Sequence, residues 1–148
     1  MRTSCRFAMA VHVLAVLAYK EGDRVTSADL AGSVNTNPVI IRRLLLSLQK
    51  AKLVETCKGA GAGSRLNRSP RRINMAEIYK SVEETEPFAK PTRKPSATCP
   101  VAQCMLEALN KVFKSAEAAM ERDLSKTTLA DVMDAVKASC GCDEKKAI

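Results

Sequence analysis

Two adjacent arginines, Arg42 and Arg43, follow an Asn37-Pro38 pair by about one helical turn. An arginine guanidinium can donate two parallel hydrogen bonds to the O6 and N7 atoms of guanine, and an asparagine amide can pair with adenine in a similar way. These residue types at this spacing indicate a helix that reads DNA bases. The alternative is that both arginines are only solvated, and the sequence does not decide which of them reads a base and which binds a phosphate.

A glycine-rich segment, KGAGAG over 58–63, is the second candidate for contact with DNA, and Arg65 lies just beyond it. Glycine allows unusual dihedral angles and keeps a loop tip thin enough to enter a groove. A glycine-rich loop can also cradle a nucleotide phosphate, but such loops open a helix, whereas this one joins two short strands. The residues predicted to contact DNA from the helix starts, the turn and this loop are Thr26, Ser27, Thr36, Asn37, Val39, Arg42, Arg43, Lys58, Gly59, Gly61 and Arg65.

Cysteines offer redox chemistry. Cys99 and Cys104 are the redox-sensing candidates, because the basic stretch 90–94 precedes Cys99 and nearby cations lower the pKa of a thiol. Oxidation can join Cys99 to Cys104, provided that the helix starts after Cys99, or to Cys5, to Cys57 or to a second subunit. The alternative is that Cys104 is a small core residue and Cys99 an exposed, inert thiol. The six cysteines are not expected to form a structural disulfide framework in a cytoplasmic protein.

No metal site or cofactor is expected. Cys140 and Cys142 resemble a chelating pair, but two ligands in a charged tail do not make a zinc site. His12 is the single histidine of the chain, and on a helix such a residue is more often packed or hydrogen-bonded in the core than a metal ligand.

The elements that must position these residues follow from the spacing of apolar residues. That spacing predicts helices over about 7–18, 26–33, 38–52, 73–84, 102–124 and 128–138, and strands over about 53–57 and 64–67. Thr26 with Asp29 three residues later, and Asn37 before Pro38, are helix N-cap signals. Two helices joined by a tight turn form a helix-turn-helix, and a small hairpin directly after it is a wing. The expected packing face of the first helix is Phe7, Val11, Leu14, Ala15 and Ala18.

The predicted fold class is therefore mainly α with a small β-hairpin wing: a winged helix-turn-helix domain plus a long helix. The predicted division is a winged helix-turn-helix domain at 1–86, a Pro/Lys-rich linker at 87–101, the long helix and a last helix at 102–138, and a tail at 139–148.

Charge is unevenly distributed along the chain. Residues 1–75 hold 13 Lys and Arg against 4 Asp and Glu, whereas the remainder holds 11 against 12, out of a net charge of +8. A basic domain joined to a near-neutral one suits a polyanion-binding head and an assembly segment. An enzyme is not expected, because the chain has one histidine, no Ser-His-Asp set and no phosphate-binding motif. No stretch is long and apolar enough to span a membrane, and the chain is expected in the cytoplasm.

Five stretches resemble the Rrf-two family of bacterial winged-helix transcription regulators, and within it the YwnA-like branch. They are Ser4–Leu14 (SCRFAMAVHVL), Ser33–Val39 (SVNTNPV), Arg42–Leu44, Lys52–Val54 and Cys99–Val101. The resemblance implies a homodimer in which the long helices pair and two recognition helices face successive major grooves of a pseudo-palindromic operator. It also implies that Arg2 and Arg6 lie near the DNA backbone. The dimerisation residues on the long helix are then Leu106, Leu109, Val112, Phe113, Ala116 and Met120.

Two departures from the family pattern matter. The wing carries Ser64 where the family usually has an aromatic residue. Members that bind an iron–sulfur cluster carry three closely spaced cysteines where this chain has Cys99 and Cys104, and Gln103 and Glu107 cannot replace a soft thiolate. The resulting prediction is a dimeric DNA-binding repressor that cysteine oxidation controls. The alternatives are a winged-helix adaptor that binds protein instead of an operator, and a metal- or cluster-sensing regulator.

Overall fold

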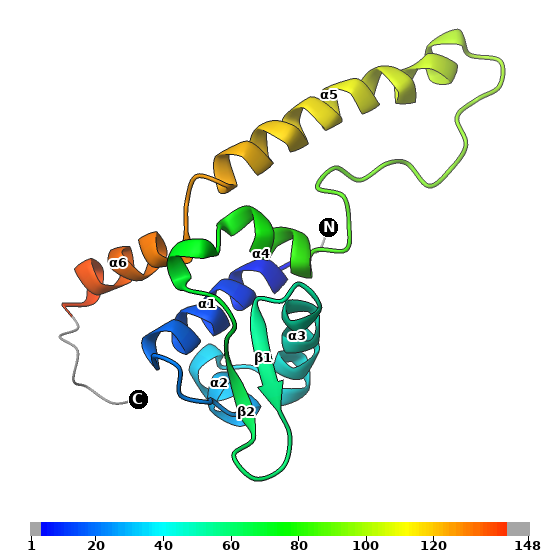
Figure 1. The fold of residues 1–148 in the computed structure, drawn as a ribbon. Coiled ribbons are helices and arrows are strands. Elements are labelled where there is room, and N and C mark those ends of the chain that lie inside the picture. The colour runs from blue at the N-terminus through cyan, green and yellow to red at the C-terminus, as the bar shows by residue number, and fades with distance from the viewer. Residues whose placement is uncertain (1–3, 142–148) are drawn as a thin grey trace.

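The computed structural model describes residues 4–141, and Figure 1 shows a helical domain with one hairpin and two further helices. Its elements are α1 (Arg6–Tyr19), α2 (Ser27–Val34), α3 (Pro38–Lys50), β1 (Val54–Cys57), β2 (Gly63–Leu66), a 3-10 helix (Pro70–Arg72), α4 (Met75–Val82), α5 (Pro100–Leu124) and α6 (Leu129–Cys140). The two strands form one antiparallel sheet in which Glu55 faces Arg65. The predicted class, mainly α with a two-stranded wing, is confirmed.

The core lies between α1, the helix-turn-helix and α4. Its largest fully buried side chains come from all of these elements and from the start of the wing: Leu14, Leu17, Leu30, Ile41, Leu44, Leu48, Leu53, Ile73 and Ile78. Burying one such side chain stabilises the folded state by roughly 1.5–3 kcal/mol. Because Leu44 and Leu48 anchor one side of α3, the opposite side of that helix is fixed toward solvent.

The buried face of α1 differs from the predicted one. Ala10, Val13 and Leu17 are buried together with Leu14, whereas Val11 is only partly buried. Nearly every residue of this helix is apolar, so the spacing of apolar residues does not select a face. Packing against α2, β2, α4 and α6 selects it instead.

The last helix, α6, joins the core of the winged-helix domain. Leu129 is fully buried there, and its backbone N–H donates to the Ile73 carbonyl at 2.8 Å. The Met75 N–H donates to the Thr127 carbonyl at 2.9 Å, so two backbone hydrogen bonds join the segment before α6 to the segment before α4. The predicted division placed 102–138 in one unit, whereas α6 packs on α1 and the 3-10 helix.

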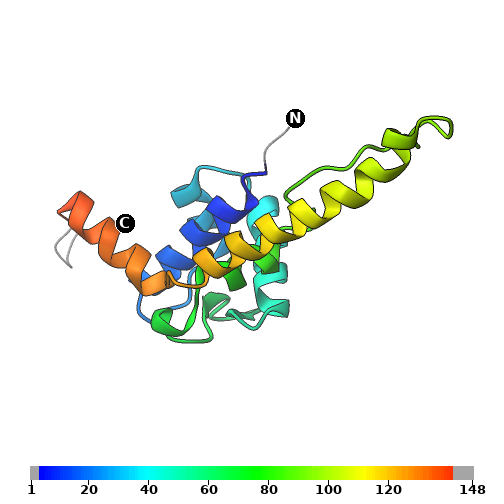
Figure 2. The same cartoon turned by 90° about the horizontal axis from the view of Figure 1, so that it is seen from above.

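The long helix α5 leaves the domain. It has 25 residues and none of them is buried. Figures 1 and 2 show it extending beyond the helical domain in both views. Residues 83–99 before it contain no regular helix or strand, as the prolines of the linker predict. Within residues 4–141, no helix is long and apolar enough to cross a membrane.

Candidate nucleic-acid interface

The turn of the helix-turn-helix is built by local side-chain chemistry. Asn35 ends α2 in the left-handed conformation, with φ 57°, and the Thr36 N–H donates to the Ala31 carbonyl at 3.0 Å. Asn37 then caps α3, because its Oδ1 accepts the Val39 N–H at 2.8 Å. Asn37 was predicted to read a base, but its carbonyl oxygen is already engaged in the cap.

The solvent face of α3 carries both arginines. Arg42 and Arg43 are exposed and stand one turn beyond Val39, which is 46% exposed. The Arg42 Nε donates to the Ser27 hydroxyl at 3.4 Å, so the start of α2 supports this guanidinium and leaves its terminal nitrogens available. Leu46 lies on the same face, one turn further on, and is 59% exposed. Sequence reasoning placed Val39 on this face but did not single out Leu46.

Thr26 has a structural role at the start of α2. Its hydroxyl accepts the Asp29 N–H at 3.2 Å and donates to the Asp29 carboxylate at 2.7 Å. This is the predicted N-cap. The hydroxyl is therefore occupied, which leaves Ser27 as the residue that connects α2 to the α3 arginines.

The wing presents fewer free cations than expected. Arg65 and Arg24 both donate to the Glu55 carboxylate, at 3.2 and 3.4 Å, so Arg65 lies along the hairpin in an ion pair. Lys58 is exposed at the tip. Gly59 and Gly61 adopt positive φ, 84° and 72°, in open space.

The base of the wing depends on Gly63, which sequence reasoning did not single out. Its φ is +141°, and a Cβ atom there would stand 2.9 Å from the Val25 carbonyl oxygen. The close approach exists because Val25 and Ser64 exchange two backbone hydrogen bonds of 2.9 Å. Ser64 is buried, and its hydroxyl is hydrogen-bonded to that of Thr56 at 2.9 Å.

The start of α1 is tied to the end of α4. Arg6 forms an ion pair with Glu84 at 3.3 Å, and the Phe7 N–H donates to the Glu83 carboxylate at 3.2 Å. Figure 1 shows this end of α1 on the side of the domain away from the wing tip. Within one chain, Arg6 is therefore not brought together with the other predicted DNA contacts. Arg2 lies outside the described residues.

The predicted dimerisation residues form an exposed apolar stripe on α5. Leu106 and Val112 are exposed, and Leu109, Phe113, Ala116 and Met120 are half-buried by neighbours on the helix, the linker and α4. Phe88 of the linker stacks on Phe113, with ring centroids 4.8 Å apart. Near its other end the helix is held to α4 by an ion pair between Lys80 and Glu121 at 2.9 Å.

The two thiols at the start of α5 differ in exposure. Cys99 is half-buried and is the residue before α5, whose first residue is Pro100, and Cys104 is exposed rather than in the core. The helix thus starts after Cys99, which is the condition for an intrachain Cys99–Cys104 bond. His12 is also exposed, and its Nε2 is hydrogen-bonded to the Ser33 hydroxyl at 3.0 Å. Cys142 lies outside the described residues.

Three comparisons with known proteins agree on the class. The family model Rrf2, described as an iron-dependent transcriptional regulator, matches residues 3–135. YwnA of Bacillus subtilis (strain 168), named as an HTH-type transcriptional regulator, is 35% identical over 129 residues, which are 87% of this chain and 95% of that protein. A crystal structure titled as a DNA-binding protein is 34% identical, with a TM-score of 0.71 over 86% of this chain and 98% of that one. A transcriptional regulator from Lactobacillus plantarum, 24% identical, has the same fold with a TM-score of 0.76 over 92% and 91%.

Iron is the ligand that the family description names, so the donor set matters. Among residues 4–141, no three His, Cys, Asp or Glu side chains lie close enough together to hold a metal ion. Two soft donors, Cys99 and Cys104, lie at the start of α5, whereas an iron–sulfur cluster takes about four ligands. The described residues of one chain do not fit an iron centre.

Proposed function

The chain belongs to the Rrf2 family of DNA-binding transcriptional regulators, and from that premise we propose that two copies act together as a cytoplasmic repressor on a pseudo-palindromic operator. It is a regulator and not an enzyme. In the proposed complex, α3 enters the major groove and Arg42 and Arg43 contact base edges or phosphates. The wing tip with Lys58 follows the neighbouring backbone. Repression results from occupation of promoter DNA.

The observation that carries this proposal is the solvent face of α3. Val39, Arg42 and Arg43 are exposed on the first turns of the helix, opposite a face anchored in the core by Leu44 and Leu48. A recognition helix presents these first turns to the bases. The brace from Ser27 limits the rotamers of Arg42, which lowers the entropy lost when it binds.

The dimer is supported by the apolar stripe on α5. A helix of 25 residues is about 37 Å long, enough to span the interval of about 34 Å between two half-sites one turn apart. Val101 is 64% and Val112 61% exposed, and such residues on one helix favour pairing with a second copy.

A thiol switch is supported by Cys99 and Cys104 at the start of that same helix. Oxidation would form one S–S bond and release two protons and two electrons, which reduce one molecule of hydrogen peroxide to two of water. The bond would constrain the first turn of α5 and alter the pairing of the two helices.

The first test selects binding sites from random oligonucleotides with the reduced protein and repeats the selection after mild peroxide. A palindromic site bound only by reduced protein supports the operator and the switch together. The same site bound in both states removes the switch and keeps the operator. If no site is enriched, operator binding is wrong and the adaptor function takes its place. Cys99→Ser should remove the peroxide effect, whereas Cys5→Ser, at an exposed thiol elsewhere, should keep it.

The second test removes the arginines of α3. Arg42→Ala with Arg43→Ala should weaken operator binding about 100-fold or more, because each good base contact contributes about 1–3 kcal/mol. Lys111→Ala with Lys114→Ala on α5 is the matched control, since it removes the same charge far from the recognition helix. Wild-type affinity in the arginine variant would show that α3 does not read the operator. Binding by the wild-type chain should fall steeply with salt, because phosphate contacts release counterions.

A further inference from the structure

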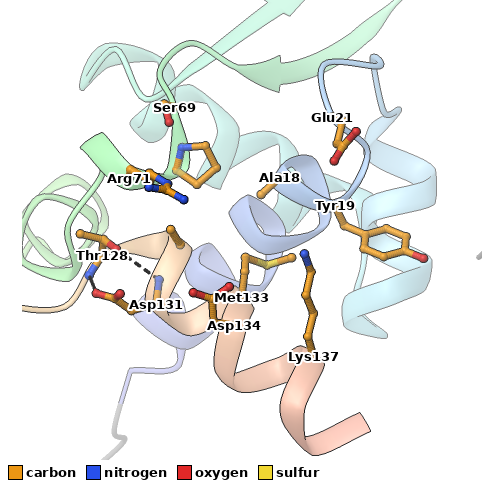
Figure 3. Close-up of a pocket in the computed structure, with 12 residues that line it drawn as sticks. Ala18, Tyr19, Glu21, Ser69, Arg71, Thr128, Asp131, Met133, Asp134 and Lys137 are labelled. Carbon is orange, nitrogen blue, oxygen red and sulfur yellow. Dashed lines mark hydrogen bonds between the residues drawn. The ribbon is translucent and has the colours of Figure 1, made fainter. Parts of the chain in front are cut away.

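A cleft of about 920 Å³ lies between the end of α1, the 3-10 helix and α6. Its apolar lining includes Ala18, Pro70 and Met133. Figure 3 shows Arg71 and Lys137 reaching into this space from the 3-10 helix and from α6, with Asp134 between them in that view. Its volume lies within the range of about 300–1,000 Å³ that small-molecule sites occupy.

Four charged side chains line the cleft without partners. They are Glu21, Arg71, Asp134 and Lys137, two of each sign. Within residues 4–141, none of these side chains forms an ion pair or a hydrogen bond. Asp131 also lines the cleft, but its carboxylate accepts the Thr128 N–H at 2.9 Å and belongs to the cap of α6. The four unpaired groups are therefore the ones available to a ligand.

We propose that this cleft binds a small zwitterion with an apolar side chain, an amino acid or a dipeptide, and that its occupation changes operator affinity. The carboxylate of the ligand pairs with Arg71 or Lys137, and its ammonium group pairs with Glu21 or Asp134. Hydrogen bonds between such ionised groups are the strong ones, and Ala18, Pro70 and Met133 cover the apolar part. A simple anion or a simple cation would leave two like charges of the cleft uncompensated.

The position of the cleft connects a ligand to the DNA-binding surface. Arg71 lies on the 3-10 helix, five residues beyond the end of β2, the return strand of the wing. Asp134 and Lys137 lie on α6, which follows α5 directly and is tied to the segment after the 3-10 helix by the Leu129–Ile73 and Met75–Thr127 hydrogen bonds. A zwitterion that bridges these residues would hold the wing, α1 and α6 in one arrangement. A ligand shifts an equilibrium only by preferring one state, and a bridged cleft is such a state.

Calorimetry on the purified full chain tests binding directly. The probes are L-leucine and L-leucyl-L-leucine, with isoamylamine and 4-methylpentanoate as analogues that each lack one charge. At least one zwitterion should bind, and each analogue should bind about tenfold more weakly or worse, since a lost charged pair is worth roughly 1.4 kcal/mol or more. No heat from either zwitterion overturns the proposal, and so does equal affinity for the analogues.

Two variants locate the site. Asp134→Asn and Lys137→Gln each remove one exposed charge from α6 and should each lower the affinity about tenfold, with unchanged melting temperature. Asp123→Asn and Lys126→Gln, at an exposed ion pair that joins the last turn of α5 to the turn after it, are the matched controls and should bind normally. Equal binding by all four variants would place the ligand elsewhere and overturn the assignment.

The proposed effect of the ligand on operator affinity rests on the proposed function, and it is measured separately from ligand binding. Leucyl-leucine should change the operator affinity of the wild-type chain at least about threefold, and Lys137→Gln should need an about tenfold higher concentration of the dipeptide for the same change. If the ligand binds in the calorimeter but operator affinity does not change, the ligand does not regulate DNA binding, and the binding site in the cleft still stands. If no operator is found, the calorimetry still decides the cleft, so the two proposals fail separately.

Discussion

The winged-helix domain and α5 are both rich in apolar residues, yet they use them in opposite ways. In the domain, leucines of α1, α2 and α3 converge on one core and are nearly inaccessible to water. In α5, none of the 25 residues is buried, only Leu124 at its end packs against that core, and its valines face solvent. The fold of one chain therefore covers the apolar residues of the domain but leaves apolar residues of α5 exposed. A second copy of α5 is the partner that our proposal supplies.

The largest expected effect comes from substitutions that disrupt the proposed contact between two copies of α5. Leu109→Asp with Phe113→Asp should yield monomers, because each burial of an unpaired carboxylate at an apolar contact costs several kcal/mol. Light scattering measures the mass. Ser115→Asp, an exposed position on the other side of the helix, should remain dimeric. Unchanged dimer mass in the double variant would refute the interface, and far-ultraviolet circular dichroism shows whether the variants keep their helices.

The next largest effect tests whether α6 belongs to the winged-helix domain rather than to the α5 region. Leu129 follows α5 in sequence, yet its side chain is fully buried in the winged-helix core. Leu129→Ala should lower the free energy of unfolding by about 3 kcal/mol, measured by urea denaturation at fixed protein concentration. Val136→Ala, at a largely exposed apolar residue of the same helix, is the control and should cost well under 1 kcal/mol. Equal losses in both variants would mean that α6 does not dock through Leu129.

Local motifs explain how much of this could be predicted from the sequence. The caps at Thr26 and Asn37 were predictable because an N-cap needs only a few consecutive residues. The glycine-rich turn located the hairpin for the same reason. Each of these features depends on interactions within four residues or on backbone preference.

Features that depend on distant residues were not predictable. The buried face of α1 is determined by packing against five other elements, and α6 docks with one fully buried side chain, that of Leu129. Within the candidate site, Arg65 was taken as a free cation although Glu55 faces it across the hairpin. The cross-strand register that pairs them depends on where the turn closes, and sequence patterns locate a turn only to within a residue or two.

A third prediction concerns the joint between the wing and the domain. Gly63→Ala should destabilise the fold by about 1–3 kcal/mol, because a Cβ atom would meet the Val25 carbonyl at 2.9 Å and φ is +141°. Gly61→Ala has positive φ but open space, so its cost should stay near 1 kcal/mol. Thermal melting compares the two. Equal melting temperatures would show that the wing does not press against Val25, and Gly63→Ala should also weaken operator binding by displacing Lys58.

The smallest expected effect is a pH dependence of the free energy of unfolding. It arises at the start of α6, the helix that follows α5 and packs on the domain. Hydrogen bonds from the Thr128 backbone N–H and hydroxyl lower the pKa of Asp131 below its usual 3.8. A lowered pKa means that the carboxylate stabilises the folded state above about pH 4 and that this contribution is lost as the pH falls through that range. The stability difference between wild type and Asp131→Asn in urea should therefore be present at pH 7 and shrink as the pH falls below about 4. A difference that stays constant across this fall in pH would show that packing, rather than the charge in the cap, fixes the start of α6.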